Sequence, residues 1–193
     1  AAEELGRDGV ELVRRAVLVW GRPGQRRPIA GRKREQQERD GYVLETWELD
    51  LNGIEPVPAY LARPQALKGR TPAVLFNHSH GGGYKIGKQE FIEGRSYLQP
   101  VPYAKVLTDL GYVGLCIDHW VFGERSHTTE QDMFKAMLWQ GTVLWGMMVY
   151  DSLRALDWLV ERADVRTVFA TPHHPYTRGG SRPPTSRVNA GEI

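Results

Sequence analysis

The stretch "VLFNHSHGGGY", residues 74–84, runs from an apolar, strand-like segment into two histidines and three consecutive glycines. Two different chemistries use such a pattern. His78 and His80 have the H-x-H spacing with which some hydrolases present two zinc ligands. Alternatively, the glycines let the backbone turn so that its N–H groups face a substrate. Other residues of the sequence indicate whether this is a metal site or a site built of backbone donors.

The composition is typical of a soluble globular domain. The chain has 193 residues, of which 41% are apolar and 25% charged, and its formal net charge is +2. This length gives one domain with a substantial buried core. No apolar run approaches the ~20 residues that a membrane span needs. The basic segment 21–41 lacks the interleaved aromatic residues typical of nucleic-acid binding. We therefore expect neither a membrane nor a nucleic acid among the partners.

The single cysteine bears on both compartment and chemistry. Cys116 lies in the apolar run "YVGLCID", so we predict a buried, inert thiol and, without any intrachain disulfide, a cytoplasmic protein. The first residues, "AAEELGRDG", lack the basic-then-apolar order of a signal peptide. The Met- and Trp-rich segment 133–160 indicates core packing rather than a cofactor site, and we expect no cofactor.

Apolar periodicity divides the chain into three parts. Residues 1–40 are predicted to be an N-terminal helix, from apolar positions between Leu12 and Trp20, followed by a solvated, charged linker. Residues 41–170 are predicted to be the folded domain. Residues 171–193 contain four prolines and few apolar side chains, and are predicted to be an irregular tail.

Within the predicted domain, the pattern changes from a hairpin to alternating strands and helices. "YVLETWELDL" and "VPAYLARP" flank an Asn-Gly turn, which is the signature of a β-hairpin. Short apolar strands at 73–76 and 112–118 then alternate with helical segments at 103–111 and 133–160. Such alternation predicts an α/β fold with a mostly parallel sheet flanked by helices. Gly141 and Gly146 predict a break or a close contact in the last helix.

Three segments resemble the first half of an α/β-hydrolase, of the branch that includes dienelactone hydrolases and acetyl-xylan-esterase-like enzymes. "PAVLFNHSHGGG" resembles the family's third strand and its HGGG-type oxyanion loop. "LTDLGYVGLCIDHWVFGERS" resembles the helix, fourth strand and loop that follow. "WGMMVYDSLRALDWLVERADV" resembles the helix that leads to the nucleophile strand. The resemblance implies an α/β-hydrolase-like sheet and a carboxylic-ester hydrolase that acts on a small ester.

The glycine loop is the predicted oxyanion hole. An ester carbonyl oxygen becomes an anion when it is attacked, and backbone N–H donors already aimed at it stabilise the transition state. We predict the donor at Gly82 or Gly83, with Gly81 in the same loop, His80 supporting the loop through its ring, and Tyr84 lining the pocket.

A metal-dependent hydrolase that uses His78 and His80 is the alternative. The metallo-β-lactamase pattern continues with an Asp and a His, and Gly82 and Gly83 stand at those positions here. More distant ligands would have to come from His119, His127, His173 or His174. We therefore favour the oxyanion loop and expect no bound metal.

The catalytic triad of the family is missing from the sequence. The chain contains no G-x-S-x-G pentapeptide, and we find no credible nucleophile among Ser79, Ser96, Ser126, Ser152 and Ser181. Because the acid and base follow the serine in this fold, none of Asp118, Asp151, His119 and His127 matches a triad position. We therefore expect an impaired or inactive enzyme. The other alternative is a non-catalytic, truncated product, diverging near Val165, whose exposed sheet edge pairs with another chain, including a second copy.

Overall fold

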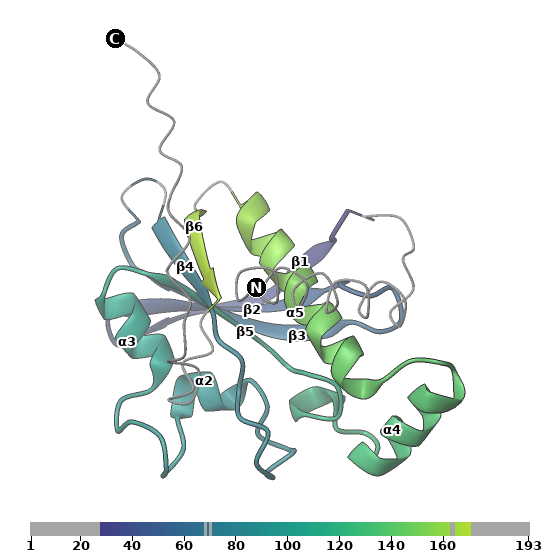
Figure 1. Ribbon diagram of the computed structural model, residues 1–193. Helices are drawn as coiled ribbons and strands as arrows, with labels where there is room; N and C mark the ends of the chain where they lie inside the picture. Colours follow the sequence, from purple (N-terminus) through teal and green to yellow (C-terminus); the bar gives the residue numbers. More distant parts are fainter. Residues whose placement is uncertain (1–27, 68, 70, 163–164, 171–193) are drawn as a thin grey trace, which may run out of the picture.

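The computed structural model describes residues 28–67, 69, 71–162 and 165–170, which form a six-stranded sheet with helices on both faces (Figure 1). The strands are β1 (Gly31–Arg39), β2 (Tyr42–Leu49), β3 (Val57–Pro64), β4 (Thr71–Leu75), β5 (Val113–Ile117) and β6 (Val165–Ala170). The helices are α2 (Gln89–Glu93), α3 (Tyr103–Asp109), α4 (Glu130–Trp139) and α5 (Leu144–Glu161), with a 3₁₀ turn at Gly123–Arg125. The predicted N-terminal helix and C-terminal tail lie outside the described residues.

The sheet has the strand order β1-β2-β3-β5-β4-β6. The pairs β1–β2, β2–β3 and β3–β5 are antiparallel, whereas β4 pairs in parallel with both β5 and β6. The predicted α/β class is confirmed, although the sheet is mixed rather than mostly parallel. Because β4 and β5 are parallel neighbours, the loops that follow them leave the sheet at the same edge.

The predicted hairpin is formed by β2 and β3, and the residues between them explain its turn. Gly53 has a φ of 70°, in the left-handed region that glycine adopts without strain. The Asn52 side-chain oxygen accepts hydrogen bonds from the backbone N–H groups of Ile54 and Glu55, at 2.8 and 3.1 Å. The Asn-Gly signal in the sequence therefore identified this turn correctly.

The charged segment predicted to be a linker forms strand β1 at the edge of the sheet. Every residue of β1 is exposed, so the sequence carries no alternation of apolar and polar positions. Backbone pairing with β2 holds the strand in place, with a register shift between Lys33 and Glu35. Arg32 and Arg34 both form ion pairs with Glu48 on β2. Charges of this kind on an edge strand also oppose pairing with other chains.

Two apolar clusters fill the opposite faces of the sheet. On one face, Ala155, Trp158 and Leu159 of α5 pack against sheet residues that include Leu115 and Ile117. On the other face, α2 and α3 contribute Phe91, Ile92 and Ala104, which pack with Leu44, Ala62 and Cys116. Cys116 is fully buried, as predicted, and its burial holds the thiol pKa well above its usual value.

The long helix predicted over 133–160 is two helices. Thr129 caps α4 by accepting a hydrogen bond from the Asp132 N–H, so helix begins before residue 133. Gly141, with a φ of 74°, lies between α4 and α5 and accounts for the predicted break. Gly146 lies inside α5 instead. Met137 of α4 and Met147 of α5 belong to a third apolar cluster, which packs under the loop after β5.

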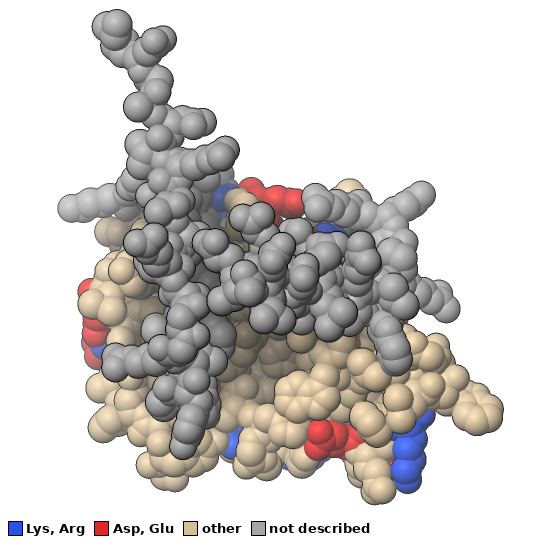
Figure 2. Space-filling model, in the orientation of Figure 1, with Lys and Arg blue, Asp and Glu red and all other residues tan. Residues whose placement is uncertain are grey.

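The surface of the described residues is of mixed charge. On the face shown in Figure 2, Lys and Arg side chains lie in small groups near Asp and Glu side chains rather than in one basic patch. Among the described helices, none is long and apolar enough to cross a membrane.

Candidate active site

The loop after β4 carries the predicted oxyanion donors at the edge of the sheet where β4 and β5 end. Gly82 and Gly83 both have positive φ angles, of 79° and 64°. The Gly82 N–H donates to the His80 carbonyl oxygen at 2.6 Å. No acceptor for the Gly83 N–H is found within the described part of the chain. Of the two predicted donors, Gly83 is therefore the one whose N–H has no acceptor among the described residues.

The buried carboxylate of Glu90, on α2, anchors this loop by hydrogen bonds and an ion pair. Glu90 is fully buried, and its Oε1 accepts hydrogen bonds from the backbone N–H and the hydroxyl of Ser79, at 2.8 and 3.0 Å. Its Oε2 lies 2.5 Å from Nε of Arg95, and Nη1 of Arg95 donates to the Gly82 carbonyl at 3.3 Å. These contacts fix both the start of the loop and its glycines, and they occupy the Ser79 hydroxyl.

A second carboxylate, that of Glu130 on α4, bridges the two residues that flank the glycine triplet, His80 and Tyr84. His80 Nε2 lies 2.9 Å from Glu130 Oε1, and the Tyr84 hydroxyl donates to Glu130 Oε2 at 2.5 Å. The hydrogen bond from Tyr84 lowers the pKa of Glu130 and, conversely, raises that of Tyr84. Aromatic rings surround the pair, because the His80 ring centroid lies 5.1 Å from Trp145 and 5.4 Å from Phe122. Sequence reasoning missed Glu130.

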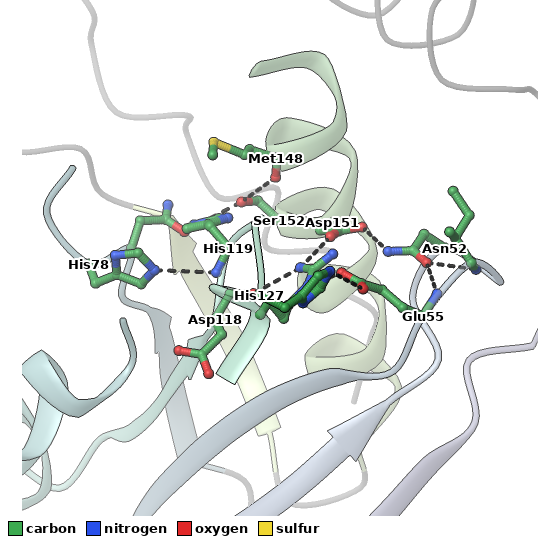
Figure 3. Close-up of polar contacts among 12 residues, drawn as sticks. Asn52, Glu55, His78, Asp118, His119, His127, Met148, Asp151 and Ser152 are labelled. Atoms are coloured by element: carbon green, nitrogen blue, oxygen red, sulfur yellow. Dashed lines mark hydrogen bonds and ion pairs between the residues drawn. The ribbon is translucent and has the colours of Figure 1, made fainter. Parts of the chain in front are cut away.

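Both ring nitrogens of His78 have hydrogen-bond partners within the protein. Its Nδ1 lies 3.2 Å from the Ser79 carbonyl oxygen, and its Nε2 accepts from the backbone N–H of His119 at 3.3 Å (Figure 3). These partners assign the neutral tautomer with the proton on Nδ1. Burial lowers the pKa of His78, and it lowers the pKa of His119 to about 3. Both histidines are therefore neutral near pH 7.

The described residues do not support the metal hypothesis for His78 and His80. His78 uses both nitrogens within the protein, and His80 directs Nε2 to Glu130. Within the part of the chain that the structure describes, no three His, Cys, Asp or Glu side chains gather as a metal-binding set. His119, named as a distant ligand, instead directs its Nε2 to Asn77 Oδ1 at 3.1 Å.

Asp118, at the carboxyl end of β5, is a buried structural carboxylate. It accepts hydrogen bonds from the backbone N–H and Nζ of Lys88, each at 2.7 Å, and from the Glu124 N–H at 3.1 Å. Nζ of Lys88 also contacts Glu124. Gly87 and Gly123 lie directly against the carboxylate of Asp118. The loops after β4 and β5 are thereby joined, and Asp118 has no freedom to orient a catalytic histidine.

Asp151 of α5 is likewise part of a buried ion pair (Figure 3). Its Oδ2 accepts from Nη1 of Arg125 at 2.9 Å, and its Oδ1 accepts from the Asn52 amide at 2.9 Å. Arg125 also donates to Glu55 at 2.6 Å and to the Asp118 carbonyl at 2.9 Å, and stacks over Trp120 at 4.2 Å. Burial raises the pKa of Asp151. This network ties the hairpin turn to α5 and to the loop after β5.

Two further serines, Ser126 and Ser152, have hydroxyl groups that are hydrogen-bonded within the protein. The Ser126 hydroxyl donates to the Gly123 carbonyl at 2.6 Å. The Ser152 hydroxyl lies 3.1 Å from the Met148 carbonyl oxygen and 3.4 Å from Asn77 Oδ1 (Figure 3). Neither has a histidine as its hydrogen-bond partner, so neither is arranged as an activated nucleophile.

The short apolar run "VRTVFA", at which the resemblance was expected to end, forms strand β6. It pairs in parallel with β4, and its last residue, Ala170, lies opposite Leu75. The carboxyl end of β6 therefore lies at the same edge of the sheet as the start of the glycine loop. Open α/β sheets bind their ligands at this edge.

The chain is similar in sequence to a bacterial protein whose name describes it as a hydrolase. No family model matches the chain. Over 141 residues, or 73% of the chain, it is 51% identical to "Putative hydrolase YtaP" of Bacillus subtilis (strain 168), and the match spans 47% of that protein. The chain thus spans about half the length of this curated relative.

Solved structures of esterases share the fold. A putative acetyl xylan esterase from Bacteroides fragilis superposes with a TM-score of 0.64 at 21% identity, covering 85% of this chain and 46% of that one. The acetyl xylan esterase from Paenibacillus sp. R4 gives 0.51 at 14% identity, covering 83% and 49%. At such identities the likeness shows the fold. Together with the strand order and the loop after β4, this likeness shows that the chain has the fold of the α/β-hydrolases.

Proposed function

We propose that this chain carries the oxyanion-stabilising part of a carboxylic-ester hydrolase that acts on small esters. The observation that carries the proposal is the Gly83 N–H, which has no acceptor among the described residues and lies in a loop at the ligand edge of the sheet. A developing oxyanion needs such a donor to be in place before the reaction. Glu90 and Glu130 hold the loop from two sides, so the donor is pre-organised.

We propose further that turnover by this chain is slow. The sequence has no G-x-S-x-G, and Ser79, Ser126 and Ser152 are all hydrogen-bonded to groups other than a histidine. An oxyanion hole without an activated nucleophile still accelerates acyl transfer, by roughly 10³-fold over water in serine hydrolases that lack a triad.

Two glycine substitutions test the oxyanion loop. In Gly83→Ala the new Cβ would lie 3.1 Å from both Arg95 Nη1 and Ile86 Cδ1, at a positive φ, so the donor must shift. In the matched control Gly81→Ala the Cβ meets nothing within 4 Å, and φ is not positive. The readouts are hydrolysis of p-nitrophenyl acetate and affinity for a methylphosphonate ester, a tetrahedral anion. We expect Gly83→Ala to weaken both by ~10-fold or more and Gly81→Ala to change neither. Equal effects of the two variants would contradict the proposal.

The second candidate function is association with another chain through the sheet edge. The observation that favours it is the position of β6 at the end of the strand order, paired with β4 alone among the described strands. An unpaired edge offers backbone N–H and C=O groups to a further strand. Light scattering across a concentration series tests it, because a chain that remains monomeric throughout does not self-associate through this edge.

A further inference from the structure

We propose that His80 is a general base that activates water directly, and that Glu130 is the positioning residue that orients it. This inference rests on the proposed ester hydrolysis and adds to it the group that removes a proton. The chain has no activated serine among its described residues, but it does have a histidine–carboxylate pair inside the loop that carries the oxyanion donor.

The hydrogen bonds of His80 leave one ring nitrogen available. Nε2 lies 2.9 Å from Glu130 Oε1, and a carboxylate only accepts, so Nε2 carries the proton. In the neutral ring Nδ1 is then an acceptor, and no group among the described residues bonds to it. The side chain is 39% exposed, so water reaches the ring. His78, two residues earlier, has both nitrogens occupied and does not share this property.

The surroundings of His80 fix its orientation. The ring lies between Phe122 and Trp145, and the Tyr84 hydroxyl holds the second oxygen of Glu130. Glu130 and Tyr84 are the titratable groups beside His80. The hydrogen bond from Tyr84 lowers the pKa of Glu130, which keeps the carboxylate ionised and able to stabilise an imidazolium. A donor to the oxyanion stands three residues away, at Gly83.

The proposed step balances without any further reactant. Nδ1 of His80 takes a proton from a water molecule while the water oxygen bonds to the ester carbonyl carbon, and the carbonyl electron pair moves to the oxygen that faces the Gly83 N–H. On collapse the bond from carbon to the alcohol oxygen breaks, and the imidazolium returns its proton to that oxygen. The products are the alcohol and the carboxylic acid, which then ionises.

The test compares two histidine–glutamate pairs of the same chain. His127 lies 3.9 Å from Glu55 and is exposed, and it does not belong to the loop of Gly81 to Gly83. Variants His80→Ala, Glu130→Gln and the control His127→Ala are assayed with p-nitrophenyl acetate from pH 5 to 9. After the rate in buffer alone is subtracted, we expect the rate of His80→Ala to be at least ~10-fold lower than that of the unchanged chain, as for loss of a general base. The rate of His127→Ala should be unchanged. Glu130→Gln should lower the rate and move the midpoint of the pH–rate profile to lower pH, which a purely structural role would not do.

A second measurement separates this inference from the proposed function. Affinity for the methylphosphonate ester reports the oxyanion loop alone. If the phosphonate binds but His80→Ala leaves the rate unchanged, or changes it no more than His127→Ala does, the general-base role is wrong and the oxyanion loop stands. If the phosphonate does not bind and the rate is unchanged in every variant, both are wrong.

Discussion

Replacing Arg125 with methionine should destabilise the fold more than any single change at the surface. The guanidinium is 2% exposed and donates to Glu55, Asp151 and the Asp118 carbonyl. Methionine fills a similar volume but leaves the fully buried Asp151 carboxylate with the Asn52 amide as its one remaining hydrogen-bond partner among the described residues. Removing one member of a buried ion pair typically costs 3–5 kcal/mol, and we expect a loss of about that size at pH 8.

The loss should be smaller in acid, because the fold already raises the pKa of Asp151. A carboxyl whose pKa is higher in the folded than in the unfolded state favours folding when it is protonated, and this contribution is lost as the pH rises through the folded pKa. Without Arg125 the folded pKa of Asp151 rises further. Arg125→Met should therefore regain part of its free energy of unfolding between pH 8 and pH 5.

Urea unfolding, followed by tryptophan fluorescence at both pH values, measures these differences. Lys105→Met, which breaks the exposed pair with Asp109 one helical turn away, is the matched control and should change little. Adding Asp151→Asn to Arg125→Met removes the buried charge and should restore part of the stability at pH 8. Similar losses for Arg125→Met and Lys105→Met, or no pH dependence of the former, would refute the reasoning.

Three further predictions concern other parts of the chain. Gly114→Ala places a Cβ 2.5 Å from Phe91 Cζ in the core and should lower the free energy of unfolding by about 1–3 kcal/mol, measured by the same urea titration. Cys116 is buried with a raised thiol pKa, so a thiol reagent at pH 8 should label it in urea but not in the folded chain; rapid labelling without urea would show that the core opens. Purified protein should hold less than one zinc per chain by elemental analysis, whereas about one zinc that is lost in His80→Ala would restore the metal hypothesis.

The sequence predicted the elements in which buried apolar residues form a recognisable pattern. The hairpin of β2 and β3, strands β4 and β5, and the turn at Gly53 were all identified, since each has an apolar pattern or a turn residue that the fold requires. Strand β1 was missed because its side chains are all exposed, so only its backbone pairing with β2 defines it. Periodicity carries no information about such a strand.

The supports of the candidate site were harder to predict than the loop itself. Glycines at positions 81–83 are visible in the sequence, but Glu130 is 50 positions from His80, and the partner of Asn77 on α5, Ser152, is 75 positions away. Nothing local distinguishes Glu130 from any other acid in the first turn of a helix. These contacts exist only because parallel strands bring distant loops to one edge of the sheet.

The position of Asp118 between Gly87 and Gly123 sets a rule for anyone who randomises this chain in search of new activity. A Cβ at either glycine would lie 2.2 Å from Asp118 Oδ1, so neither position has room even for a methyl group. A library should therefore leave Gly87, Asp118 and Gly123 all unchanged. Diversity belongs instead at Gly81, where an added side chain meets open space beside the loop.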